Sequence, residues 1–192
     1  MSAPARLDAP WVRAPATRAV LDAVGEAYFV GGCVRNALLG AEVTDIDLAT
    51  PLHPEEVARR LGRAGLKAVP TGIEHGTVTA VSEGHPFEIT TYRADVETDG
   101  RRAVVRFSAD MAEDAARRDF TMNALYADRE GRVIDPLGGL SDLRARRVRF
   151  IGDARARIRE DYLRILRFFR FSARYAGEGI EPEGLAACAA LA

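Results

Sequence analysis

The stretch Thr44–Thr50 (TDIDLAT) places two aspartates one residue apart inside an apolar run. The alternation of polar and apolar residues predicts a β-strand, in which Asp45 and Asp47 share one face while Ile46 and Leu48 turn into a core. Two neighbouring carboxylates repel each other, and a divalent cation such as Mg²⁺, which prefers oxygen ligands, would relieve that repulsion. The alternative is a solvated edge strand with incidental acidic residues.

The composition indicates a globular protein with a substantial core. The 192 residues are 47% hydrophobic and 29% charged, with a formal net charge of −1, which argues against an indiscriminate nucleic-acid binder. No apolar run is long enough to span a bilayer, and no signal-peptide pattern is visible. Cys33 and Cys188 match no metal-binding spacing, so we expect structural thiols in a reduced, cytoplasmic setting.

Arginine is concentrated in the C-terminal half of the chain, where we therefore expect any phosphate-binding surface. The clustered residues are Arg144, Arg146, Arg147, Arg149, Arg155, Arg157, Arg159, Arg164, Arg167, Arg170 and Arg174.

A glycine pair follows the buried strand expected at Tyr28–Val30. Gly31 and Gly32 open a short helix that ends at Gly40. Glycines allow backbone N–H groups to approach a phosphate, so the turn is a candidate anion site, although packing alone would also explain it. Arg35 has two candidate partners, a bound phosphate or the Asp47 carboxylate.

A third acidic residue lies in a second predicted strand. Residues 76–81 and 87–92 alternate as the strands of a hairpin, and Glu88 stands between Phe87 and Ile89. If this strand neighbours the aspartate strand, three carboxylates converge, as a two-metal site for attack at phosphorus requires. The alternative is an exposed strand residue. Residues 95–102 are polar and contain a glycine, which predicts a mobile loop.

The segment Glu113–Leu125 is the second dense polar stretch. It carries Arg118, Asp119 and Asn123 around Phe120. Guanidinium and amide groups could recognise ribose hydroxyls and triphosphate oxygens. A buried salt-bridge network is the alternative.

The chain is predicted to be helical from Ala154 onward. Glu160, Asp161 and Arg164 lie one turn apart, for which intrahelical ion pairing is the simplest interpretation. The apolar face of Leu185–Ala192 has no evident cover within the chain. The residues Ile158, Tyr162, Ile165, Leu166 and Phe169 fall at helical spacing and predict a buried stripe.

Four motifs, in order, resemble the class II (bacterial-type) CCA-adding tRNA nucleotidyltransferases and the related bacterial poly(A) polymerases over residues 25–177. They are GGCVRNALLG with TDIDLAT, RRDFTMNA, DPLGG and EDYLR. The resemblance implies an α+β head of the DNA polymerase β-like nucleotidyltransferase fold, with a mixed sheet of about five strands and flanking helices. We expect an N-terminal lead-in at 1–24, poorly ordered over 1–16, the head at 25–150, and the start of a helical neck at 151–192.

The resemblance also implies a role for individual residues. One position departs from the family, which often has aspartate where this chain has Asn36. The implied residues are Asp45, Asp47 and Glu88 for catalysis, the first two as metal ligands; Gly31, Gly32 and Arg35 for the nucleotide phosphates; Arg118, Asp119 and Asn123 for the ribose; Asp135, Gly138 and Gly139 for a hinge; and Asp161, Arg164 and Arg167 for base selection.

The implied reaction adds C and A residues from CTP and ATP to the 3′ end of tRNA without a nucleic-acid template. Two Mg²⁺ ions, with Mn²⁺ as an alternative, would support attack of the RNA 3′-hydroxyl on the α-phosphate and release of pyrophosphate. Asp161 can only accept hydrogen bonds, which suits the amino groups of C and A. Arg164 would donate to the base.

Other functions stay open on the sequence. Poly(A) addition, or A-only or CC-only addition, uses similar head motifs. A truncated chain that only binds nucleotide or RNA is a further alternative, because members of the family usually continue into helical body and tail domains. We therefore expect a head-plus-neck fragment, whose oligomeric state the sequence leaves open.

Overall fold

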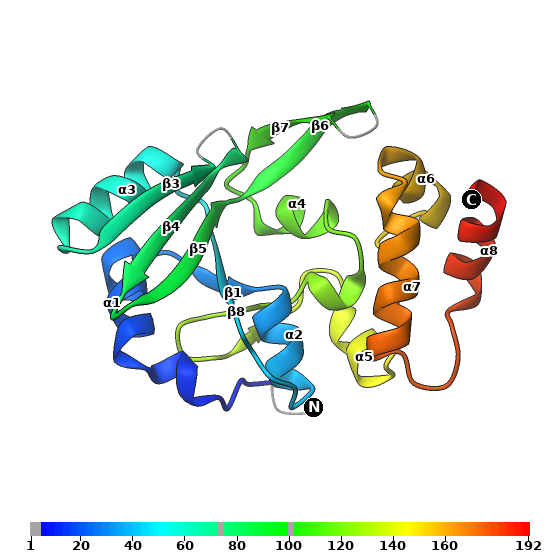
Figure 1. The fold of residues 1–192 in the computed structure, drawn as a ribbon, viewed down its shortest axis with the longest axis horizontal. Coiled ribbons are helices and arrows are strands. Elements are labelled where there is room, and N and C mark those ends of the chain that lie inside the picture. Colours follow the sequence, from blue (N-terminus) through cyan, green and yellow to red (C-terminus); the bar gives the residue numbers. More distant parts are fainter. Residues whose placement is uncertain (1–4, 73–74, 100–101) are drawn as a thin grey trace.

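The computed structural model describes residues 5–72, 75–99 and 102–192 and contains a mixed seven-stranded sheet (Figure 1). The order is β3 (Lys67–Gly72), β4 (Thr77–Ser82), β5 (His85–Thr91), β2 (Ile46–Thr50), β1 (Tyr28–Val30), β8 (Tyr126–Ala127) and β9 (Val133–Ile134). The α+β head with a mixed sheet is confirmed. The sheet has seven strands rather than about five, because the short β8–β9 hairpin extends it beyond β1.

Strands β2 and β5 are the parallel neighbours in this sheet, and the other pairs are antiparallel. Their register places Asp47 opposite Glu88 and Leu48 opposite Ile89. Since successive strand side chains point to opposite faces, the acidic residues lie on one face and the apolar residues on the other.

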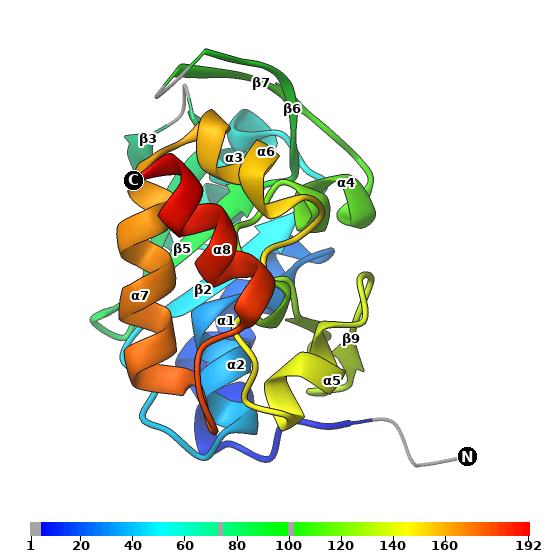
Figure 2. The ribbon, with the colours of Figure 1, turned by 90° about the vertical axis from the view of Figure 1, so that its right-hand side faces the viewer.

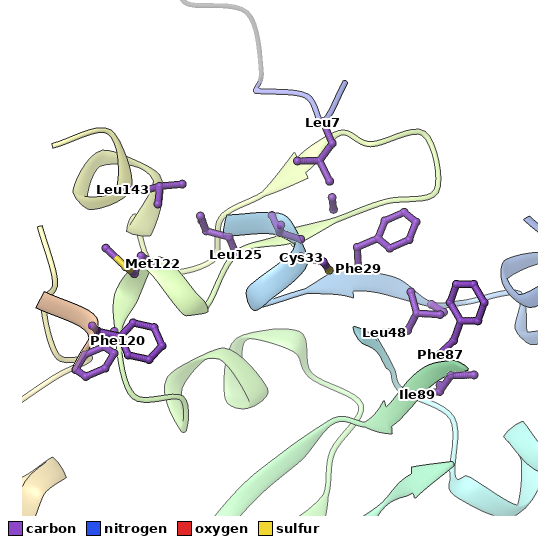
Figure 3. Packing of buried hydrophobic residues seen from close by; sticks show 14 of the residues in the cluster. Leu7, Phe29, Cys33, Leu48, Phe87, Ile89, Phe120, Met122, Leu125 and Leu143 are labelled. Atoms are coloured by element: carbon purple, nitrogen blue, oxygen red, sulfur yellow. The ribbon is translucent and has the colours of Figure 1, made fainter. Parts of the chain in front are cut away.

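The apolar face packs against helices α1 (Pro15–Val24), α2 (Gly32–Leu38) and α3 (Pro54–Arg63). Phe29, Leu48, Phe87 and Ile89 are buried in this core (Figure 3). The hydrophobic effect thus fixes the orientation of β2 and β5, and with it the direction of the acidic residues between these apolar positions.

The prediction of poor order over residues 1–16 is wrong for residues 5–16. A short 3₁₀ helix, η1 (Pro10–Arg13), precedes α1, and both helices have proline at the first position, where it fits without loss of a hydrogen bond. Leu7 and Val12 are buried, and the Leu7 N–H donates to the Gly131 carbonyl over 2.8 Å. Apolar contacts therefore attach this segment to the core. Residues 1–4 lie outside the described residues.

The loop predicted for residues 95–102 is also wrong. Strands β6 (Arg93–Asp99) and β7 (Arg102–Phe107) form a separate antiparallel pair that projects from the sheet toward α6 in Figure 1. A two-stranded ribbon satisfies its backbone hydrogen bonds by itself, so a polar sequence does not prevent its formation. Residues 100–101 lie outside the described residues. Helix α4 (Met111–Ala116) follows the ribbon.

The C-terminal helices α6 (Ala154–Glu160), α7 (Leu163–Tyr175) and α8 (Pro182–Leu191) form a layer beside the sheet (Figures 1 and 2). The predicted buried stripe is correct at Ile158 but wrong at Tyr162, Leu166 and Phe169, which are 55%, 68% and 42% exposed. The helix stops after Glu160 and restarts at Leu163, which changes the helical phase. The aromatic residues of α7 that face inward are Phe168, Phe171 and Tyr175.

Helix α8 lies against α6 in Figure 2 and is partly covered, contrary to the prediction of an uncovered face. Ala187 and Cys188 are buried, and a Cβ at Gly184 would come within 2.6 Å of the Phe168 ring. Cys33 and Cys188 are both buried, free thiols. Within the described ranges, no helix has the length and hydropathy required to cross a bilayer.

Candidate active site

The strand-borne carboxylates lie on the sheet face opposite the main core. Asp45 immediately precedes β2, Asp47 lies within it, and Glu88 occupies the paired position on β5. The prediction that these two strands are neighbours is confirmed. Asp47 is half-buried, whereas Asp45 and Glu88 are exposed.

Burial, together with repulsion from Glu88 and Asp45, raises the pKa of Asp47 to about 6, while Arg118 acts in the opposite direction. A carboxylate in this environment is stabilised by an added cation. In the described part of the chain, no group of three or more His, Cys, Asp or Glu side chains is arranged to hold a metal ion. The predicted convergence of three carboxylates is therefore wrong, although the two strands are neighbours. A metal at Asp45 and Asp47 would take its remaining oxygen ligands from a bound substrate or water.

A pocket of about 480 Å³ lies between this face and helix α7. Asp45, Glu88 and the predicted hinge residues do not line it, whereas Arg117, Leu163 and Phe171 do. The predicted residues that line it together are Gly31, Gly32, Arg35, Asp47, Arg118, Asp119, Asn123, Asp161, Arg164 and Arg167.

Gly31 brings the turn after β1 against Arg118. Its φ is +70°, in the left-handed region, and a Cβ at this position would stand 3.3 Å from the Arg118 guanidinium. Both the backbone conformation and the available space therefore favour glycine here.

Asp114, in α4, is the buried partner of two pocket arginines, Arg117 and Arg118, and was missed by the sequence interpretation. Its carboxylate accepts from Arg118 over 2.9 Å, from Arg117 over 3.1 Å and from the Tyr126 hydroxyl over 2.7 Å. Burial alone would raise the pKa of Asp114, but the Arg118 and Arg117 guanidinium groups hold it below its usual value. Asp114 precedes Arg117 by three residues and Arg118 by four. On a helix this spacing brings the side chains together, and it was the sequence signal that could have identified Asp114.

A chain of side-chain hydrogen bonds joins the head to α7. Arg35 donates to Asn123 over 2.5 Å, Asn123 donates to Asp119 over 2.8 Å, and Arg167 donates to Asp119 over 2.5 and 2.8 Å. The alternative of a salt-bridge network in the Glu113–Leu125 segment is thus confirmed. The side chains of this network also line the pocket, so the two interpretations apply to the same residues.

Arg35 does not pair with Asp47, which was one of its two predicted partners. Its guanidinium donates to the Tyr175 hydroxyl over 2.8 Å and lies 4.3 Å from the Tyr175 ring centroid. The Asn36 side chain accepts from Arg35 as well. Tyr175 lies on the buried face of α7, where it reaches Arg35. The stripe predicted from the sequence had placed Leu166 and Phe169 on that face, so it did not indicate this contact.

The break between α6 and α7 presents the predicted base-selecting residues. Asp161 follows the last residue of α6, and one carboxylate oxygen accepts from the Leu163 N–H over 3.0 Å. Arg164 donates to Glu160 over 2.5 Å and to the Arg157 carbonyl over 2.7 Å. The Arg164–Glu160 ion pair therefore crosses the break between α6 and α7 and is not the intrahelical pair predicted from the sequence, whereas Asp161 caps the turn into α7.

The predicted hinge residues lie outside the pocket and form the start of α5 (Gly139–Arg144). Asp135 accepts from the N–H groups of Gly139 and Leu140 over 2.8 and 2.9 Å. Gly139 packs so closely on η3 (Thr121–Asn123) that a Cβ would stand 2.1 Å from the Thr121 carbonyl oxygen. This contact supports the segment that carries Asn123.

Comparison with known proteins agrees with this geometry. Residues 27–149 match the model of a family described as Poly A polymerase head domain. The CCA-adding enzyme of Streptococcus pyogenes is 48% identical over 161 residues, covering 83% of this chain and 39% of that enzyme. The chain spans about two fifths of the length of the curated relatives that it matches.

Solved structures show the same fold. The Bacillus stearothermophilus CCA-adding enzyme in complex with CTP superposes with a TM-score of 0.78 at 37% identity, over 91% of this chain and 43% of that one. A tRNA nucleotidyltransferase complexed with a primer tRNA and an incoming ATP analog gives a TM-score of 0.69 at 31% identity, over 88% and 47% of the two chains.

Proposed function

The chain belongs to the Poly A polymerase head domain family, and from this membership we propose that it carries the nucleotidyltransferase site of a CCA-adding enzyme. The reaction adds C and A residues from CTP and ATP to the 3′ end of tRNA and releases pyrophosphate. The observation that carries the proposal is that residues of three separate motifs line one pocket. Relatives named as CCA-adding enzymes support it.

The pocket offers complementary groups to each part of a nucleoside triphosphate. Gly31 and Gly32 would let the phosphates approach the start of α2, with the positive charge of Arg35 behind them. The Gly31 N–H donates to the Leu125 carbonyl over 3.1 Å, so the Gly32 N–H is the one that would meet a phosphate. Arg118, Asp119 and Asn123 would bind the ribose hydroxyls. These last three side chains are already oriented by hydrogen bonds within the protein, which reduces the entropy lost on binding.

Base selection would fall to Asp161 and Arg164, with Arg167 beside them. Asp161 accepts hydrogen bonds from the exocyclic amino groups of cytosine and adenine, and Arg164 donates to ring nitrogen or carbonyl oxygen atoms. Uracil and guanine would leave these polar groups unpaired, at a cost of about 1–3 kcal/mol for each group.

Enzymes of this family generally use divalent metal ions. Asp45 and Asp47 would hold Mg²⁺ or Mn²⁺ here, with Glu88 beside them on β5. Such an ion, when bound, supplies a Lewis acid that lowers the pKa of the RNA 3′-hydroxyl and neutralises charge on the phosphates. The protein itself orients the triphosphate, and the Arg118 guanidinium offsets negative charge at the same face.

Poly(A) addition is the second candidate function, because the matching family is named for a poly(A) polymerase. An A-only or CC-only activity and a chain that only binds nucleotide or RNA are further outcomes of the same test.

Incorporation of labelled nucleotides onto a tRNA transcript that lacks CCA tests the proposal. We expect CTP and then ATP to be added with Mg²⁺, and UTP and GTP to be rejected. Combined Asp45→Ala and Asp47→Ala substitutions should abolish addition, whereas Asp8→Ala, which removes an exposed carboxylate elsewhere, should not. Use of ATP alone on any RNA end would establish poly(A) addition instead. Nucleotide binding without incorporation would restrict this chain to a binding role.

A further inference from the structure

A second, smaller cavity adjoins the nucleotide pocket along α7. Its volume is about 280 Å³, and it is lined by Arg35, Arg170, Phe171, Arg174 and Tyr175. Arg35 and Phe171 also line the nucleotide pocket, so the two cavities share a wall. None of the sequence motifs assigns a function to Arg170 or Arg174.

The three guanidinium groups of this cavity are held by aromatic rings. Arg35 lies 5.2 Å from the Phe171 centroid and 4.3 Å from that of Tyr175. Arg170 lies 5.8 Å from Phe171, and Arg174 lies 5.3 Å from Tyr175. Cation–π contacts orient the arginines without neutralising them.

The arginines of α7 differ in their partners. Arg164 and Arg167 pair with Glu160 and Asp119. Among residues 5–72, 75–99 and 102–192, no carboxylate lies within 4.0 Å of the guanidinium nitrogens of Arg170 or Arg174. Two exposed cations beside the buried cation Arg35 repel one another, and a bound anion would relieve that repulsion.

We propose that Arg170, Arg174 and Arg35 form a second phosphate subsite beside the nucleotide pocket. The proposal rests on the proposed function, which provides two sources of phosphate, the backbone near the RNA 3′ end and the released pyrophosphate. A cavity smaller than the nucleotide pocket suits a phosphate group. Arg170 and Arg174 can each donate two hydrogen bonds to one phosphate. The Arg35 guanidinium, which donates to Asn36, Asn123 and Tyr175, would contribute its positive charge. Its position along α7 would extend a phosphate track away from the reacting nucleotide.

The test combines Arg170→Gln with Arg174→Gln. Both side chains are exposed, and glutamine is a good helix former, so the fold should be retained. Arg63→Gln, which removes an exposed arginine at the end of α3, is the matched control. Binding of CTP, of a short single-stranded RNA and of pyrophosphate is measured separately, the RNA over a range of salt concentrations.

If the subsite holds the RNA backbone, the double variant binds RNA more weakly, and the slope of log K against log salt falls by about 0.7 for each phosphate that the protein no longer neutralises. If it holds pyrophosphate, pyrophosphate affinity falls instead. In both cases the CTP affinity of the double variant, and all three affinities of the Arg63→Gln control, stay at the wild-type level. Each source is thus identified by its own measurement.

Unchanged RNA and pyrophosphate binding in the double variant would overturn the subsite. A fall in CTP affinity as large as that for either ligand would also overturn it, because the arginines would then serve the nucleotide pocket. Failure of wild-type protein to bind CTP would instead count against the proposed function. The RNA and pyrophosphate measurements contain no CTP, so they test the subsite independently of that outcome.

Discussion

The two walls of the nucleotide pocket are built differently. On the head wall, Arg118 is tied to Asp114, whose carboxylate is 1% exposed and accepts three side-chain hydrogen bonds. On the wall formed by α7, Arg167 is 43% exposed and reaches the head through Asp119. A buried charge is costly without its partner, whereas a half-exposed pair is weakened by water and salt. The head wall should therefore be rigid and the α7 wall adjustable.

The largest effect is expected at the centre of the head wall. Asp114→Ala leaves Arg118, Arg117 and the Tyr126 hydroxyl without their common acceptor, which should lower the free energy of unfolding by about 3–5 kcal/mol. Urea denaturation measures this loss. Glu113→Ala removes a half-exposed neighbour on the same helix that accepts from Arg106 and Ser108, and it should have a far smaller effect because water can solvate the groups left behind. Similar losses in both variants would contradict a special role for Asp114.

Gly139→Ala tests the support behind the head wall. The added methyl group would meet the Thr121 carbonyl oxygen at 2.1 Å, so α5 and η3 must separate, at a cost of about 1–3 kcal/mol. Gly62→Ala is the matched substitution, because it lies inside α3 with open space around it. There the change should stabilise the protein by about 0.5–1 kcal/mol. Thermal unfolding should show opposite shifts, and shifts of the same sign would exclude the close contact.

A smaller loss of stability is expected from the bridge between the walls. Arg167→Gln removes the ion pair with Asp119, and because Arg167 is largely hydrated the loss should be about 1 kcal/mol or less. CTP affinity, measured by calorimetry, should nevertheless fall, since the side chain lines the pocket. A loss of stability as large as that of Asp114→Ala would show that the α7 wall is as rigid as the head wall.

The smallest effect is expected on the outer face of α7. Leu166→Gln should change the free energy of unfolding by no more than about 0.5 kcal/mol, because this side chain is 68% exposed. Ile158→Val, at a fully buried position of α6, should cost about 0.5–1.5 kcal/mol although it removes only one methylene. A greater loss from Leu166→Gln, measured by denaturation, would favour the continuous buried stripe predicted from sequence.

The two walls also differ in how well the sequence predicts them. Strand alternation is local, so the facing of Asp47 and Glu88 follows directly from their apolar neighbours. The break at Asp161 changes the phase of every later residue in α7, and the pattern around Tyr162 and Leu166 contains no glycine or proline to reveal it. The partners of Arg35 were equally hidden, because Tyr175 is 140 residues away in the chain.

The carboxylate of Asp114 also receives the backbone N–H of Arg93, the first residue of β6, over 3.2 Å. The root of the β6–β7 ribbon and the guanidinium of Arg118 are thus attached to one side chain. A movement of β6 and β7 about Arg93 would lengthen the hydrogen bond from the Arg93 N–H to Asp114. The same carboxylate orients the Arg118 guanidinium. Displacements of the ribbon and of the pocket arginine are therefore coupled through the two oxygen atoms of one buried residue.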